Sequence, residues 1–237
     1  MGDFHRFITE FNVAANELDQ AFAAVNDNPA SLTAVHRAWE RLVAVSSIGD
    51  IPLAEVPAEQ IAGFTTRLQD LYVKRRRLEA AFHEAAHAVV GHILGLGIRS
   101  VSIHPNGHSV ARTFFCPYDP AKDGPAPTWA RRYAVMAFAG FCGSLLVKPQ
   151  ELSPGSIQDA KMAEEMLSEH GIDSSQEAAR LNALAFQITM QAQVAVRRVA
   201  TLMLHRGELE RADAVMAIHG SVSPMEYEKW EARRREV

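Results

Sequence analysis

This chain of 237 residues has few cysteines and no excess of positive charge. Its two cysteines, Cys116 and Cys142, stand among aromatic or apolar neighbours. This setting favours two reduced, packed thiols in a reducing compartment, with a single disulfide as the alternative. The net charge of −4 leaves no surplus of Lys and Arg to neutralise phosphates, so we expect a protein that does not bind nucleic acid.

A long apolar run is also missing. The uncharged stretch Tyr133–Val147 has only fifteen residues, whereas a transmembrane helix needs roughly 20. The N-terminus lacks the basic start and apolar core of a secretory signal. We therefore expect a buried helix over this stretch, no contact with a membrane and a cytoplasmic location.

Apolar residues at steps of three and four predict two N-terminal helices. The first covers about 4–25, and the second follows the helix-breaking segment Asn26–Pro29. We interpret 1–57 as a helical hairpin and a linker, with the linker marked by Gly49 and Pro52. The apolar faces of these helices pack within the chain or against a second copy, so a homo-oligomer formed through them is one alternative.

The remaining residues, 58–237, are predicted to form one domain that is mainly α with a small β-element, an α+β fold. Apolar residues alternate with polar ones at Val101 and Ile103, the dipeptide Asn106-Gly107 favours a tight turn, and the run Val110–Phe115 follows. Together these features predict one β-hairpin.

Helices are expected over most of the chain after this hairpin. The Pro-rich segment 116–128 is expected to be irregular, and helices follow over about 129–147 and 156–169. A further long helix is expected to begin at Ser174, with Glu177 in capping-box spacing.

The segment His83-Glu84-Ala85-Ala86-His87 has the HExxH pattern. Residues four apart on a helix differ by about 40° in direction, so the two imidazoles can share one metal ion. Glu84 is placed to take a proton from a metal-bound water. The flanking residues are mostly Ala, Val, Ile and Leu, which predicts a buried helix where these polar groups need a partner. A buried His–Glu hydrogen-bond network without metal is the alternative.

A tetrahedral catalytic zinc site needs a third protein ligand. His92 points about 140° away from His87 around the helix, so it does not qualify. Glu164 and Glu165 are candidates for a downstream glutamate ligand. From spacing alone, Asp159 looks like part of a helix cap that begins at Ser156.

Four segments resemble, in the same order, the peptidase domain of the FtsH family of zinc metalloproteases. They match its metal-binding helix, the strand and turn after it, its Gly-rich buried helix and its third-ligand segment, and comprise 82–91, 98–107, 137–143 and 155–163. The resemblance covers roughly 78–220. It implies an HExxH zinc-peptidase helical domain in which His83, His87 and Asp159 bind Zn²⁺ and Glu84 is the general base.

The chain departs from the family pattern in three places. Ala86 replaces a glycine of the HExxH motif, and Ser144 and the leucines after it stand where the family has an acidic residue. This second change leaves the support of the ligands in question. The sequence also contains no GxxxxGK[ST] nucleotide-binding loop, so we expect activity that does not depend on ATP.

These features predict an ATP-independent zinc metallopeptidase that hydrolyses unfolded or extended polypeptides. The strand near 110–115 is expected to bind such a substrate by β-augmentation. His104 and His108 are candidates for the group that stabilises the charged carbonyl oxygen. The alternatives are a catalytically silent metal-binding or interaction protein that retains the protease fold, and a hydrolase of non-peptide amides.

Overall fold

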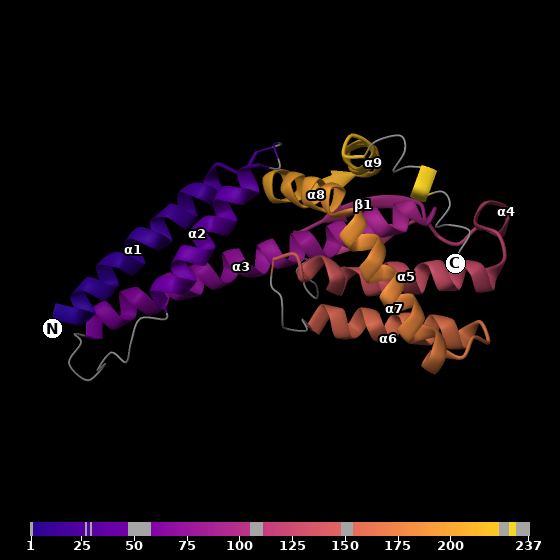
Figure 1. Cartoon of the computed structure of the whole chain (residues 1–237), viewed down its shortest axis with the longest axis horizontal. Helices are drawn as coiled ribbons and strands as arrows, with labels where there is room; N and C mark the ends of the chain where they lie inside the picture. Colours follow the sequence, from indigo (N-terminus) through magenta and orange to yellow (C-terminus); the bar gives the residue numbers. More distant parts are fainter. Residues whose placement is uncertain are drawn as a thin grey trace. The chain divides into compact units, whose positions relative to one another are not determined.

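The protein is mainly helical, with one small three-stranded antiparallel sheet, which confirms the α+β class (Figure 1). It divides into two compact units, Met1–Arg77 and Leu78–Val237. The linker expected at 47–57 lies outside the described residues. The computed structural model describes residues 2–26, 28, 30–46, 58–104, 111–147, 154–222 and 228–230.

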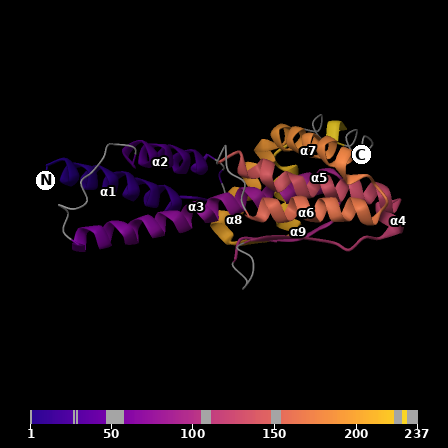
Figure 2. The ribbon, with the colours of Figure 1, turned by 90° about the horizontal axis from the view of Figure 1, so that it is seen from below.

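The first unit contains α1 (Gly2–Ala23), α2 (Ser31–Ser46) and the first half of α3 (Ala58–Ile93). The predicted pair of N-terminal helices is present, and α1 and α2 pack side by side (Figure 2). Phe11 is fully buried and meets the ring of Phe64 on α3, with 4.7 Å between the ring centroids. Association of these helices with a second copy stays a prediction.

A cluster of ion pairs explains why the first half of α3 belongs to this unit. Arg67 and Lys74 on α3 both contact the Asp19 carboxylate on α1. Burial raises the pKa of Asp19, but hydrogen bonds from Lys74 and Arg67 outweigh this effect and lower it. The division between the two compact units falls within α3, after Arg77.

The second half of α3 is the buried centre of the second unit. From Ala81 to Ile93 it consists largely of small or branched apolar residues, and most of them are fully buried. The helix ends at Ile93, and Gly95 in the turn after it has a φ of 84°. The N–H of Leu96 donates to the Gly91 carbonyl across this left-handed residue, which is the hydrogen bond of a Schellman motif.

The sheet has the order β2-β1-β3, and all of its neighbouring strands are antiparallel. The predicted hairpin is present as β1 (Ile98–Ser102) and β2 (Arg112–Phe115), although its turn lies outside the described residues. The third strand, β3 (Glu208–Glu210), was not predicted. It follows Gly207, whose φ of 83° turns the chain back onto β1. Within the described chain β2 is therefore an edge strand.

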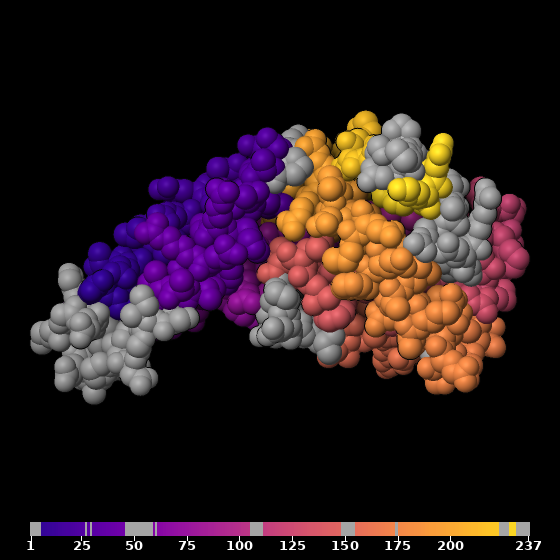
Figure 3. Space-filling model, in the orientation of Figure 1, coloured from indigo at the N-terminus to yellow at the C-terminus, as the bar shows by residue number. Residues whose placement is uncertain are grey.

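Helices α5 (Ala126–Ser144), α6 (Pro154–Glu169) and α7 (Ser174–Gln191) pack together in the second unit. In Figures 1 and 3, α7 crosses in front of α5 and α6. Part of the segment expected to be irregular instead forms the short helix α4 (Pro120–Asp123). Asp119 caps this helix and Pro120 occupies its first turn.

The long helix predicted after Ser174 is interrupted. The backbone turns at Ala192, where φ is −96° and ψ is 15°, and α8 (Gln193–Arg206) begins after it. No glycine or proline marks this break in the sequence. After β3 the chain forms α9 (Arg211–His219).

Both cysteines are free thiols, so the reduced alternative holds. Burial raises the pKa of the Cys142 thiol to about 12, which keeps this residue protonated and inert. Among the described residues, no helix has both the length and the apolar character needed to cross a bilayer.

The predicted capping box of α7 is wrong. The N-cap is Asp173, whose carboxylate accepts a hydrogen bond from the Ser175 N–H at 3.0 Å. Glu177 instead accepts hydrogen bonds from Arg131 on α5 at 2.8 Å and from Arg180 at 2.7 Å. The hydrogen bond from Arg180 lowers the pKa of Glu177 most. Burial raises this pKa, but the two arginine bonds together bring it down to about 2. This glutamate therefore joins α7 to α5 instead of capping its own helix.

We expect Glu177→Gln to lower the free energy of unfolding by about 1 kcal/mol at pH 7, because the ion pairs are partly exposed. The folded-state pKa of about 2 lies below the unperturbed value of 4.5. The carboxylate therefore stabilises the fold above pH 4.5, and this contribution is lost as the pH falls through 2. Chemical denaturation at pH 7 and pH 3 should show the gap between variant and wild type narrowing.

Glu164→Gln is the matched control, because Glu164 is exposed on α6 and forms no ion pair within the described chain. It should leave the free energy of unfolding nearly unchanged. An equal gap for Glu177→Gln at both pH values would contradict the assigned role.

Candidate functional site

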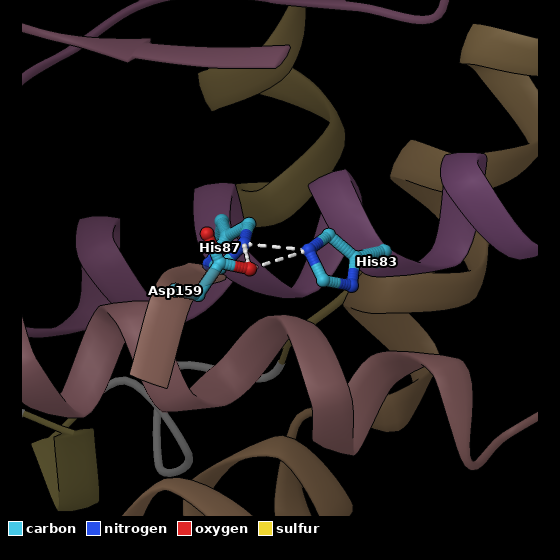
Figure 4. A group of neighbouring side chains, drawn as sticks. All are labelled: His83, His87 and Asp159. Atoms are coloured by element: carbon cyan, nitrogen blue, oxygen red, sulfur yellow. Dashed lines mark hydrogen bonds and ion pairs between the residues drawn. The ribbon is translucent and has the colours of Figure 1, made fainter. Parts of the chain in front are cut away.

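Three side chains from two helices converge inside the second unit. His83 and His87 project from the same face of α3, and Asp159 reaches them from α6 (Figure 4). The two Nε2 atoms are 3.0 Å apart, and Asp159 Oδ2 lies 2.8 Å from His83 Nε2 and 3.3 Å from His87 Nε2. His83 and His87 are only 8% and 6% exposed. These groups can hold a metal ion.

The geometry fits a small tetrahedral cation. Ligand atoms at bond lengths of about 2.0–2.2 Å in a tetrahedral site lie about 3.3 Å apart, close to the three separations found here. Gly140 on α5 faces the same point. A Cβ at this position would lie 2.4 Å from His87 Nε2 and 2.6 Å from His83 Nε2. The missing side chain of Gly140 therefore leaves a space of about the right size between the two nitrogens.

Each imidazole is oriented through its other nitrogen. His87 Nδ1–H donates to the Met136 carbonyl at 2.8 Å. The Ser144 hydroxyl donates to the Gly140 carbonyl at 3.3 Å, and it accepts from His83 Nδ1–H at 3.3 Å. These bonds leave both Nε2 atoms free to bind a metal. Ser144 thus supports His83 where the family resemblance leads us to expect an acidic residue.

The pKa values of His87 and Asp159 depend on each other. Burial lowers the pKa of His87, but the hydrogen bond and charge of Asp159 outweigh it, with further contributions from Glu84 and the Met136 carbonyl, and raise it to about 9. Burial raises the pKa of Asp159, but hydrogen bonds from His83 and His87 bring it well below its usual range. A divalent cation would take the place of the proton on His87, so metal binding should release a proton.

Glu84 is buried next to His83 on α3, and its carboxylate is hydrogen-bonded to β2. Its carboxylate Oε2 accepts a hydrogen bond from the Thr113 hydroxyl on β2 at 2.7 Å, and its backbone carbonyl lies 3.0 Å from the same hydroxyl. Glu84 is 8% exposed and does not belong to the cluster that can hold a metal. The structure therefore includes Asp159 in the cluster that could hold a metal and leaves Glu84 outside it.

The alternative reading of Asp159 as a helix-capping residue does not fit. Helix α6 begins at Pro154, so Ser156 is already helical and cannot be its N-cap. Asp159 is the sixth residue of the helix, and its carboxylate contacts His83 and His87. Its position is therefore explained by the imidazoles and not by the helix terminus.

The methyl group of Ala86 fits between α3 and α5 because the residue opposite, Gly143, has no side chain. Ala86 is fully buried, and a Cβ on Gly143 would lie 2.5 Å from its side chain and 2.4 Å from the Phe82 carbonyl oxygen. The substitution in the HExxH motif thus leaves the two histidines in place. It makes the glycine on α5 indispensable for the close approach of α3 and α5.

A cavity of about 450 Å³ opens beside the three ligands, and Glu84 lines it. A second cavity of about 780 Å³ adjoins it. The two cavities are neighbours, because they share five lining residues. The shared residues are Arg112, Thr113, Phe115, Tyr133 and Met162.

Other predicted candidates lie elsewhere. His92 pairs with His219 of α9, at 3.0 Å between their Nε2 atoms. His104 does not line the ligand cavity, and its ring packs on Gly207. Glu164 and Glu165 are on an exposed face of α6. The other turn histidine, His108, lies outside the described residues.

Sequence reasoning missed Gly140 and Thr113, and it interpreted Ser144 as a loss of support. The sequence did contain a signal for Thr113. It is a polar residue on the inward face of β2, between Arg112 and Phe114 on the exposed face. Gly140 and Ser144 had no such signal, because their roles depend on which helix lies opposite.

In comparisons with known proteins, no protein-family model and no curated protein matches this chain. The resemblance to the FtsH peptidases therefore remains an expectation from the motifs.

We expect Gly140→Ala to abolish binding of divalent metal, because the added methyl would occupy the space between the two Nε2 atoms. Alanine is the better helix former by about 1 kcal/mol, so α5 itself should persist. Metal content after dialysis against Zn²⁺, with circular dichroism as a check of the helices, measures the effect.

Gly63→Ala is the control for the helix propensity, because nothing lies within 4 Å of a Cβ at that position of α3. It should keep the metal content and stabilise the helix. A Gly140→Ala protein with the metal content of wild type would show that the ion does not bind between the histidines.

Proposed function

We propose that this protein is a zinc-dependent peptidase in which His83, His87 and Asp159 hold the metal and Glu84 is the general base. The observation that carries the proposal is the placement of Glu84. Glu84 lines the same cavity as the three ligands without belonging to their cluster, and its carboxylate accepts a hydrogen bond from Thr113. A purely structural metal site needs no such second carboxylate.

Zinc is the metal that best suits this ligand set. Two imidazoles and one carboxylate with an open side are typical of catalytic zinc, whereas Mg²⁺ and Ca²⁺ prefer oxygen ligands only. The FtsH-like order of metal helix, strand, Gly-rich helix and third-ligand helix supports the same assignment. The free thiols agree with the cytoplasmic location that we propose.

Zinc, when bound, polarises the scissile carbonyl and acidifies a water molecule. The chain supplies the proton transfers. Glu84 accepts a proton from the attacking water and then delivers it to the leaving nitrogen. Thr113 holds Oε2 of Glu84 at 2.7 Å, which leaves Oε1 without a hydrogen-bond partner among the described residues. That oxygen is the one available to the water.

The substrate is proposed to be an extended peptide. Within the described chain β2 pairs only with β1, and three of its residues line the ligand cavity. A peptide that adds to this edge by β-augmentation would pass beside Glu84 and the metal ligands. Such a peptide would need no nucleotide to reach this edge.

We expect Glu84→Gln to keep its metal and to lose at least ~10²-fold in kcat, the lower end of general-base contributions. The reason is that Glu84 is not a ligand and the amide cannot take up a proton. Zinc content and cleavage of a fluorogenic casein-type substrate should be measured on the same preparation.

Glu165→Gln is the matched control, because Glu165 is an exposed glutamate on α6 that sequence reasoning considered as a ligand. It should keep both metal and activity. Equal activity in Glu84→Gln and wild type would refute the mechanism. Wild-type protein that binds zinc and cleaves nothing would favour the alternative, a catalytically silent metal-binding or interaction protein.

We also expect cleavage to depend on how unfolded the substrate is. A stable domain is globally open in about 10⁻³–10⁻⁶ of molecules, and only that fraction offers an extended chain to β2. The same protein, tested folded and after destabilising mutation, should be cut at rates that follow its open fraction, with or without ATP. Rapid ATP-stimulated digestion of the stable form would contradict this.

A further inference from the structure

Peptide hydrolysis places negative charge on the carbonyl oxygen, and a hydrogen-bond donor fixed near that oxygen accelerates the reaction. Of the two turn histidines, neither is seen to offer a donor in the ligand cavity. His104 packs on Gly207 outside the ligand cavity, and His108 lies outside the described residues. The donor must therefore be sought among the residues that line the cavity.

Besides the metal ligands and Glu84, four side chains with polar hydrogens line this cavity: Arg112, Thr113, Tyr133 and Gln158. Three of them are poorly placed. The Thr113 hydroxyl is already donated to Glu84. Arg112 lies on the exposed side of β2, with its guanidinium over the Phe114 ring at 5.4 Å. Gln158 is exposed on α6.

Tyr133 is placed differently. It lies on α5 one turn before Met136, and both residues line the ligand cavity. It lines both cavities and is half-buried. Its ring is packed against Trp129, with 5.5 Å between the centroids, which limits its movement. Its hydroxyl forms no hydrogen bond with any described residue.

The hydroxyl also keeps its proton. Burial, and secondarily the charge of Asp159, raise the pKa of Tyr133 above its ordinary value. The phenol is therefore a neutral donor throughout the neutral range.

We propose that Tyr133 is a catalytic residue whose O–H donates a hydrogen bond to the scissile carbonyl oxygen as that oxygen becomes negatively charged. This inference rests on the proposed peptidase function. The water oxygen bonds to the carbonyl carbon, its proton goes to Glu84, and the π electrons of the carbonyl move to its oxygen. Tyr133 stabilises that oxygen and transfers no proton.

Loss of one such donor typically lowers kcat by about 10²–10³-fold. We expect Tyr133→Phe to lose about 10²-fold in kcat with little change in KM, because the bond strengthens only in the transition state. Metal content should equal that of wild type, since Tyr133 is not a ligand. Tyr118→Phe is the control, because its hydroxyl donates to the Gly124 carbonyl and it lines only the second cavity.

A second measurement is independent of turnover. A phosphinic peptide carries a tetrahedral centre with a charged oxygen in place of the scissile amide. Calorimetry should show that Tyr133→Phe weakens its binding by a factor similar to the loss in kcat/KM. Binding of the product peptide should stay unchanged, and Tyr118→Phe should affect neither ligand.

Tyr133→Phe with wild-type kcat, or with equal losses for the phosphinic peptide and the product, would overturn the proposal for Tyr133 and leave the peptidase intact. A loss of metal in this variant would likewise overturn it, because the role would then be structural. If wild-type protein hydrolyses no peptide and Glu84→Gln changes nothing, the proposed function itself fails.

Discussion

The close approach of α5 to α3 is the constraint on which the rest of the second unit depends. Two glycines on α5 permit it. Gly143 lies against the Phe82 carbonyl and the Ala86 methyl, and Gly140 lies against the two imidazoles. At that separation the α5 backbone can accept the Nδ1–H of His87, and Ser144 can accept that of His83. The orientation of the ligands is therefore a consequence of how two helices pack.

The same packing decides how the charged groups are tolerated. His83, Glu84 and His87 are almost completely buried, where an unpaired charge would be costly. The carboxylate of Asp159 satisfies the two imidazoles, and the Thr113 hydroxyl satisfies Glu84. Each carboxylate thus has its own partner, and the two are not interchangeable. The different roles that we propose for the two carboxylates agree with these hydrogen bonds.

Prediction from sequence succeeded where the signal is local. The periodicity of α3 placed His83 and His87 on one face, and the alternation near Val101 located β1 and β2. Asp159 needed the family resemblance, because nothing within its own helix indicates that α6 faces α3. The break at Ala192, the strand after Gly207 and the bond from Ser144 to His83 depend on distant neighbours. Sequence periodicity carries no information about such contacts.

Thr113 has a further consequence, because it belongs at once to the edge strand and to the hydrogen bond that holds the base. Anything that stabilises β2 in its extended form also stabilises the Oε2 contact of Glu84. By thermodynamic linkage the reverse holds: an ordered Glu84 carboxylate favours an ordered strand. Binding at the sheet edge and the order of the Glu84 side chain are therefore expected to change together.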